Sequence, residues 1–144
     1  MKVELIAYTP DPEATAAAAA RLCYSAKGAA DLKQGLTREE ITKLINKLIS
    51  MGHLSPMEHV SFTFAIEGVS RALSHQLVRH RIASYSQKSQ RYVDENNFSY
   101  IIPPSIAAKP EAAALFNQVM GDLQDAYRKL SQMVPREDAR YILP

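Results

Sequence analysis

The sequence is poor in cysteine and contains no long hydrophobic segment. Its single cysteine, Cys23, excludes an internal disulfide framework and a zinc site made of several cysteines. No apolar run approaches the roughly 20 residues that a membrane-spanning helix needs. The N-terminal residues, MKVELIAYTP, are too short and too mixed in character for a signal peptide. These absences predict a cytoplasmic protein that has no membrane partner.

A second absence is local, because no aspartate or glutamate occurs from Gly68 to Val93. The arginines and lysine of this segment are Arg71, Arg79, Arg81, Lys88 and Arg91. A block of one charge sign indicates an anionic partner. The whole chain carries a formal charge of only +2, so the signal lies in how the charge is distributed.

The remaining composition fits one soluble globular domain covering residues 1–144. Hydrophobic residues make up 47% of the chain and charged residues 22%, as in ordinary folded proteins. Alternating apolar side chains predict a strand at about residues 2–8 and a half-buried strand over residues 60–66. Residues 26–36 and 82–90 are predicted to be loops, and residues 91–102 are compatible with an extended segment.

Helix signals fill most of the other segments. Asp11 is a candidate N-cap for a helix with Pro12 in its first turn, and Thr37 with Glu40 forms a capping-box pattern. Helical spacing predicts a helix that ends near His80, a long helix from about 110 to 130, and a last helix from about 135. Few strands and long helices indicate an α+β fold, in which a small, mainly antiparallel sheet packs against long helices.

The basic segment is the strongest candidate for a functional site. Arg79, Arg81 and Arg91 flank a loop rich in hydroxyl groups, and a guanidinium fork suits phosphate or another delocalised anion. The alternative is that these arginines bind no ligand and simply lie at a solvent-exposed helix end, because the helix dipole favours cations there. The absence of acids within the segment favours a site.

Histidine, cysteine and serine offer weaker signals. His53 and His59 are six residues apart, which does not match a helical zinc pair, so no metal site is predicted. Cys23 has no histidine nearby in the sequence and is predicted to be a buried structural thiol rather than a nucleophile. Ser89 is a nucleophile by type, but the role of an anion-binding hydroxyl is more economical.

The order of these residues resembles that of the flavin-dependent thymidylate synthases. That family has the signature Arg-His-Arg, seven residues, then Ser, and Arg79-His80-Arg81 followed by Ser89 reproduces it. The upstream segment GHLSPMEHVSFTF and the late segment DARYILP resemble the family's sequences at those places. The resemblance spans most of residues 52–144.

The resemblance implies an enzyme that makes thymidylate from deoxyuridine monophosphate. Methylenetetrahydrofolate would supply the carbon, FAD would carry hydride, and NADPH would reduce the flavin. Such enzymes are usually homotetramers whose active sites are built from several subunits. This chemistry belongs to dTMP biosynthesis and needs no cysteine nucleophile, which agrees with a structural role for Cys23.

The resemblance also implies roles for particular residues. Those expected to contact FAD are His53, Ser55, Arg79, His80, Arg81 and Gln87. Those expected to contact the nucleotide are Gln76, Arg79, Gln87, Ser89, Gln90, Arg91 and Arg140. The residues expected to take part in catalysis are Arg79, Ser89 and Arg91. Gln87 departs from the family pattern, in which an acidic residue is common at this position.

A second departure concerns length, because family members normally continue for several dozen residues after the YILP segment. A chain that ends at Pro144 is expected to retain part of the site and to have weak or no activity. The alternatives to an enzyme are a basic module that binds nucleic acid and a fragment that serves only as an assembly core. Near-neutral total charge argues against the nucleic-acid module and predicts no nucleic-acid partner.

Overall fold

The computed structural model describes all residues from 1 to 144, and they divide into two compact units. One unit comprises residues 2–66, and the other comprises residues 67–144 together with Met1. Each is described by itself below. The prediction of a single domain stays a prediction.

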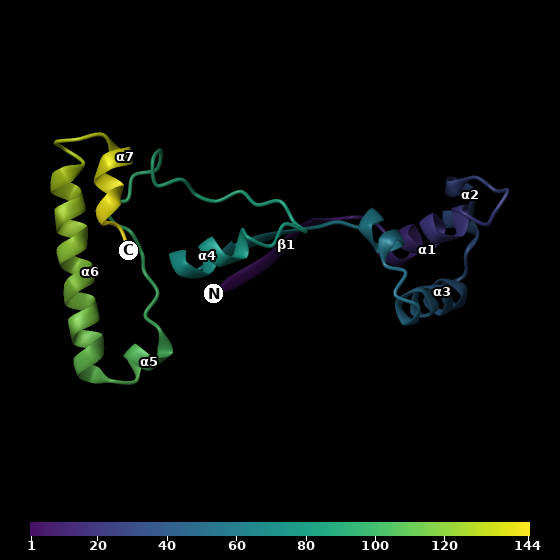
Figure 1. Ribbon diagram of the computed structural model, residues 1–144, viewed down its shortest axis with the longest axis horizontal. Coiled ribbons are helices and arrows are strands. Elements are labelled where there is room, and N and C mark those ends of the chain that lie inside the picture. The colour runs from purple at the N-terminus through teal and green to yellow at the C-terminus, as the bar shows by residue number, and fades with distance from the viewer. The chain divides into compact units, whose positions relative to one another are not determined.

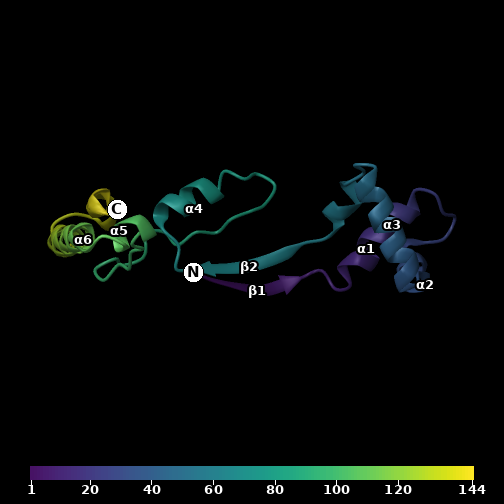
Figure 2. The same ribbon diagram turned by 90° about the horizontal axis from the view of Figure 1, so that it is seen from below.

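The first unit joins a strand pair to three helices. Its elements are β1 (Lys2–Tyr8), α1 (Pro12–Leu22), α2 (Ala29–Gly35), α3 (Arg38–Ser50), the 3-10 helix η1 (Ser55–His59) and β2 (Phe62–Glu67). β1 and β2 form an antiparallel two-stranded sheet (Figure 2). Thr9 and Ser61 extend the pairing beyond β1, since Thr9 N–H donates to the Ser61 carbonyl at 2.9 Å. The α+β class predicted from the sequence is therefore confirmed.

The predicted half-burial of the second strand is wrong. Alternation correctly indicates a strand, but nearly every residue of both strands is exposed. Phe62 and Phe64 stack on each other with ring centroids 6.4 Å apart, and each remains about half exposed. An isolated pair of strands is at best marginally stable in water, so these apolar side chains favour further packing.

Alanine supplies the core of the helical part of this unit. The buried residues of α1 are Ala16, Ala17, Ala18 and Ala20. Leu32 of α2 and Ile41 of α3 are also buried, and α1 contacts both of these helices. The prediction of a loop over residues 26–36 is wrong, because α2 occupies much of it. Asp11 does precede α1, but its side chain makes no capping hydrogen bond.

The capping box at the start of α3 is confirmed. The Glu40 N–H donates to Thr37 Oγ1 at 3.3 Å, and the Thr37 N–H donates to the Glu40 carboxylate at 2.9 Å. The helix ends before Gly52, whose φ of +71° lies in the left-handed region that glycine tolerates. Hydrogen bonds from the backbone and then the side chain of Thr37 hold the pKa of Glu40 below its ordinary value.

Replacing Thr37→Ala is expected to lower the free energy of unfolding by about 1 kcal/mol, because one N-terminal N–H of α3 loses its acceptor. The Glu40 pKa is depressed in the folded state, so its stabilising contribution is complete above the ordinary glutamate pKa. That contribution is lost as the pH falls through the lowered value. Urea unfolding at neutral and acidic pH measures both effects.

Thr42→Ala is the matched control, because the Thr42 hydroxyl donates only to the Arg38 carbonyl within the same helix. Its effect is expected to stay within about 0.5 kcal/mol. Equal destabilisation by the two substitutions would contradict a capping role for Thr37.

The second unit is built around one long helix. Its elements are α4 (Arg71–Leu77), α5 (Pro104–Ala107), α6 (Pro110–Leu130), α7 (Arg136–Ala139) and the 3-10 helix η2 (Arg140–Ile142). Figure 1 shows α7 beside one end of α6 and α5 beside the other end. Tyr127, Met120 and Ala139 are the buried apolar side chains of this unit. The predicted long helix is confirmed as α6.

Three sequence predictions for this unit need correction. The helix predicted to end near His80 already ends at Leu77, where α4 stops. Residues 91–102 contain turns instead of one extended segment, whereas the predicted loop over 82–90 is confirmed. The last helix, α7, spans only Arg136–Ala139 and continues as η2, and α5 was not predicted. No helix of the chain combines the length and apolar character needed to cross a membrane.

Candidate anion-binding site

The basic segment forms the end of α4 and the loop that follows it. Ser70 caps α4 by accepting a hydrogen bond from the Leu73 N–H at 3.1 Å. Arg79 and His80 then lie in the turn after the helix, where their N–H groups donate to the carbonyls of Gln76 and Leu77. Arg79 therefore lies outside α4, which itself carries Arg71 and His75.

Gln87 brings the middle of the loop back to the helix. Its Nε2 donates to Ser74 Oγ of α4 at 2.5 Å, and Ser74 in turn donates to the Arg71 carbonyl at 2.9 Å. Figure 2 shows the loop leaving α4 and returning alongside it. The structure thus places Gln87 close to the helix that also carries Gln76.

Ser89 organises the turn that carries Arg91. The Arg91 N–H donates to Ser89 Oγ at 3.3 Å, and the Val93 N–H donates to the Ser89 carbonyl at 3.0 Å. Ser89 and Gln90 are half-buried, whereas Arg91 is exposed with its guanidinium carbon 5.7 Å from the centroid of the Tyr92 ring. These hydrogen bonds therefore fix the backbone position from which the Arg91 side chain projects.

One of the positive charges of the segment is already engaged in an ion pair. Lys88 Nζ forms an ion pair with Glu95 at 3.2 Å, and Glu95 is the one buried charged residue of the chain. Glu95 lies just beyond the acid-free stretch 68–93, so Lys88 is paired although the stretch itself contains no acid. Arg79, Arg81 and Arg91 form no ion pair and no side-chain hydrogen bond within the chain, which leaves three guanidinium groups available to an anion.

The other predicted residues lie elsewhere. His53 and Ser55 belong to the first unit, where they are exposed in the turn after α3 and at the start of η1. Arg140 belongs to the second unit and starts η2, where its Nε donates to the Glu137 carbonyl at 3.3 Å. No hydrogen bond or ion pair joins the Arg140 side chain to the segment 76–91.

Cys23 differs from its predicted environment. The thiol is exposed at the C-cap of α1 instead of buried. No cluster of three or more histidine, cysteine, aspartate or glutamate side chains is arranged to hold a metal ion.

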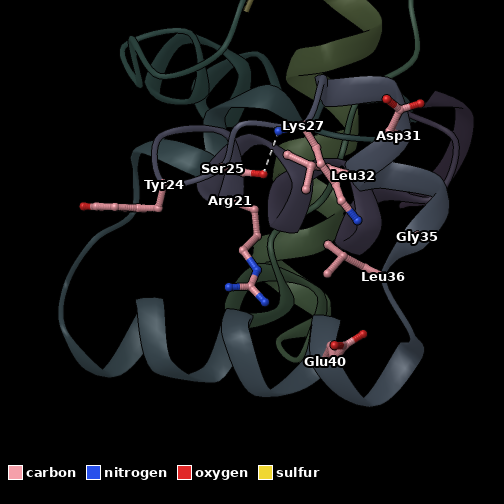
Figure 3. Close-up of a pocket in the computed structure, with 9 residues that line it drawn as sticks. All are labelled: Arg21, Tyr24, Ser25, Lys27, Asp31, Leu32, Gly35, Leu36 and Glu40. Atoms are coloured by element: carbon pink, nitrogen blue, oxygen red, sulfur yellow. Dashed lines mark hydrogen bonds between the residues drawn. The ribbon is translucent and has the colours of Figure 1, made fainter.

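The first unit contains a hollow that sequence reasoning missed. Its volume is about 320 Å³, and its walls come from the end of α1, from α2 and from the start of α3 (Figure 3). Arg21 and Lys27 line it together with Asp31 and Glu40, so the formal charges of these four residues cancel. This balance does not select an anion, unlike the three free arginines of the second unit.

An α+β chain whose α4–α5 loop presents three unpaired arginines has the features of an anion-binding protein. Residues 4–144 match the model of the family described as thymidylate synthase complementing protein. The chain therefore belongs to this family.

Curated relatives cover the whole chain. It is 51% identical over 147 residues to the flavin-dependent thymidylate synthase of Geobacter sulfurreducens and 48% identical over 161 residues to that of Clostridium tetani. It is 50% identical over 157 residues to the enzyme of the same name from Nitratidesulfovibrio vulgaris. These alignments include 99–100% of the chain but only 63–65% of each relative, so the chain spans about two thirds of their length.

Proposed function

We propose that the chain takes part in flavin-dependent synthesis of thymidylate. Deoxyuridine monophosphate would be the substrate, methylenetetrahydrofolate the carbon donor, and NADPH the reductant of bound FAD. The proposal is supported by the family of the chain and by the name that its relatives bear. A biosynthetic role of this kind also favours the cytoplasm as its location.

The observation that carries the proposal is the set of free guanidinium groups at Arg79, Arg81 and Arg91. Each planar fork offers two parallel N–H donors, the geometry that phosphate and an anionic pyrimidine accept. The turn at Ser89 adds a hydroxyl beside the Arg91 backbone. In the proposed reaction Arg79, Ser89 and Arg91 would hold the nucleotide and stabilise negative charge as it develops on the pyrimidine.

The donor set also fits FAD, whose diphosphate and isoalloxazine carbonyls accept hydrogen bonds. The proposed flavin contacts are His53, Ser55, Arg79, His80, Arg81 and Gln87. The proposed nucleotide contacts are Gln76, Arg79, Gln87, Ser89, Gln90, Arg91 and Arg140. Bound FAD would supply the hydride chemistry, and the chain would bind and orient both partners.

Gln87 can serve this site although the family often has an acid at its position. One N–H of its Nε2 donates to Ser74 Oγ, so the carbonyl oxygen and the second N–H remain for a ligand. A carboxylate would offer acceptors as well, but with a negative charge. The glutamine would keep the acceptor and avoid repelling a phosphate.

Assembly of several copies is part of the proposal. Apolar side chains of β1 and β2 are open to solvent within their unit, and exposed apolar patches indicate interaction surfaces. A homotetramer with shared sites would cover these strands. It would also allow residues of different copies, such as Arg140 and His53, to complete one site.

The purified protein is expected to bind FAD, to show flavin absorbance that NADPH bleaches, and to have the mass of four chains. The free guanidinium groups supply the affinity, and the open strands supply the interface. Flavin titration followed by a light-scattering mass measurement on the same sample tests both expectations. Turnover with all substrates then tells whether 144 residues suffice for activity.

The competing function is binding of nucleic acid. A protein that takes up no FAD but shifts an oligonucleotide, with affinity that falls steeply as salt rises, would overturn the proposal. A monomer that binds FAD would retain the cofactor assignment and remove the shared site.

A further inference from the structure

The loop that carries the proposed nucleotide contacts is held at two places. Gln87 ties it to α4 through Ser74, and the segment 92–98 is tied to α6 and α7. The turn 89–93 follows the first tie and runs into the second, and it carries Ser89, Gln90 and Arg91. Two hydrogen bonds within the turn shape its backbone, and the ties at both ends hold the turn in place.

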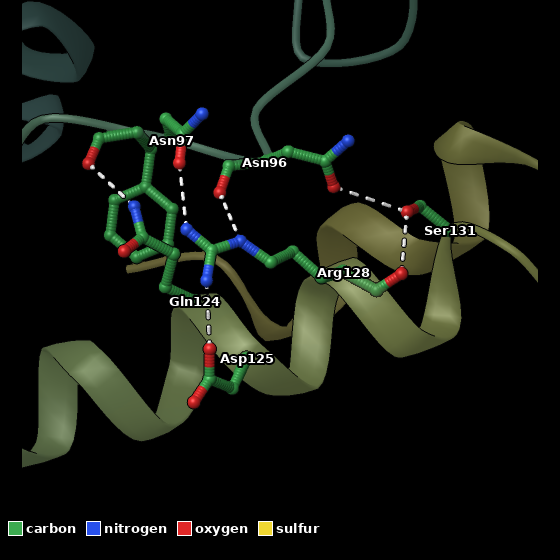
Figure 4. A network of polar contacts seen from close by, with 7 residues as sticks. Asn96, Asn97, Gln124, Asp125, Arg128 and Ser131 are labelled. Carbon is green, nitrogen blue, oxygen red and sulfur yellow. Dashed lines mark hydrogen bonds and ion pairs between the residues drawn. The ribbon is translucent and has the colours of Figure 1, made fainter.

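Arg128 of α6 makes the densest of these contacts (Figure 4). Its Nε donates to the Asn96 carbonyl at 2.9 Å, and its Nη2 donates to Asn97 Oδ1 at 2.7 Å. Its Nη1 pairs with Asp125 on the preceding helical turn at 2.9 Å. All three guanidinium nitrogens are therefore engaged, which makes Arg128 unlike the free arginines of the site.

Neighbouring side chains reinforce the same attachment. Ser131 Oγ lies 3.3 Å from Asn96 Oδ1, and Gln124 Nε2 donates to the Phe98 carbonyl at 3.4 Å (Figure 4). Arg136 donates to the Tyr92 carbonyl at 3.3 Å and approaches Asp94 at 3.6 Å. The residues that follow Arg91 are thus fastened to the long helix and its C-terminal neighbour.

We propose that Arg128 is a positioning residue, which holds the turn 89–93 in the conformation that presents Ser89 and Arg91 to the nucleotide. The inference rests on the proposed function for the identity of the ligand. A loop that is already ordered loses less conformational entropy when it binds a ligand. Lysine cannot reproduce the attachment, because it lacks the planar fork that serves Asn96 and Asn97 together.

The variants that test the proposal are Arg128→Ala and Arg128→Lys, and the matched control is Lys129→Ala. Lys129 is the exposed next residue of α6 and makes no side-chain hydrogen bond or ion pair, so its substitution removes one charge without touching the loop. Circular dichroism tests whether each variant retains its helices. Arg128→Lys keeps the test valid if Arg128→Ala fails to fold.

Two measurements decide the outcome. In Arg128→Ala and Arg128→Lys, hydrogen exchange at the Arg91 and Val93 amides should become at least tenfold faster, while the amides of α6 change little. Affinity for deoxyuridine monophosphate should fall by about 10- to 100-fold, the size of effect expected when remote positioning is lost. Affinity for FAD should stay within about twofold, since Arg79, His80 and Arg81 lie on the α4 side of the Gln87 tie.

Exchange and nucleotide affinity equal to those of Lys129→Ala would overturn the proposal. A parallel loss of FAD and nucleotide binding would also overturn it, since that result indicates general loss of structure. If the unsubstituted protein binds neither ligand, the proposed function fails. The exchange rates at Arg91 and Val93 then still decide whether Arg128 orders the turn.

Discussion

The Arg79→Ala variant is expected to bind both FAD and deoxyuridine monophosphate about 10- to 100-fold more weakly, because hydrogen bonds to a charged group contribute about 1.5–3 kcal/mol each. Arg79 makes no ion pair or side-chain hydrogen bond within the chain, so its loss should leave stability nearly unchanged. Flavin fluorescence titration and calorimetry with the nucleotide measure the two affinities, and urea unfolding measures the stability.

Arg79→Lys and Arg38→Ala separate the possible causes. The lysine variant keeps the charge but loses the fork, so it should recover only part of the affinity if two parallel hydrogen bonds matter. Arg38 is an exposed arginine at the start of α3, and its loss removes the same charge from the other unit. Titrations of Arg79→Ala that match those of Arg38→Ala would contradict the assignment of Arg79 to the site.

Local signals made the helices α3 and α6 predictable. The capping box at Thr37 and the apolar stripe of residues 115–130 each act within a few residues, so they can be recognised without knowing the fold. Helix α2 was missed because its sequence, AADLKQG, is short and buries only Leu32. Its position depends on packing against α1, which no local pattern reveals.

Burial was less predictable than conformation. Alternation over residues 60–66 correctly indicated a strand, but it does not tell whether another surface covers that strand. Similarly, Asp11 marked the start of α1, yet its φ of +48° leaves the carboxylate without a capping hydrogen bond. In both cases sequence identified the element and failed on its side-chain contacts.

The arginine-rich segment was predictable as a candidate site, but the ion pairs and hydrogen bonds that surround it were not. Only the structure shows that Glu95 pairs with Lys88, which reduces the number of free cations. Arg128 donates to the main-chain carbonyl of Asn96, 32 residues earlier in the chain. Every residue has a main-chain carbonyl, so a sequence does not show which carbonyl accepts a hydrogen bond from a distant side chain. A residue that orders a site through such bonds therefore cannot be recognised from composition or spacing.

Removing the Tyr127 side chain is expected to cause the largest loss of stability in the second unit. Tyr127 is fully buried on α6 and is the one large side chain of the chain with almost no exposure to solvent. Tyr127→Ala should lower the free energy of unfolding by about 3–5 kcal/mol, as for other buried aromatic residues. The midpoint of urea unfolding measures the change.

Tyr127→Phe is expected to raise the free energy of unfolding, whereas Tyr127→Ala lowers it. The Tyr127 hydroxyl is buried and has no hydrogen-bond partner, and such a group costs about 1–3 kcal/mol of desolvation. Phenylalanine retains the ring and removes this cost, so the free energy of unfolding should rise by about 1 kcal/mol. A fall on Tyr127→Phe would contradict this account of the hydroxyl, and comparing urea unfolding at low and high protein concentration would then show whether another copy of the chain supplies a partner.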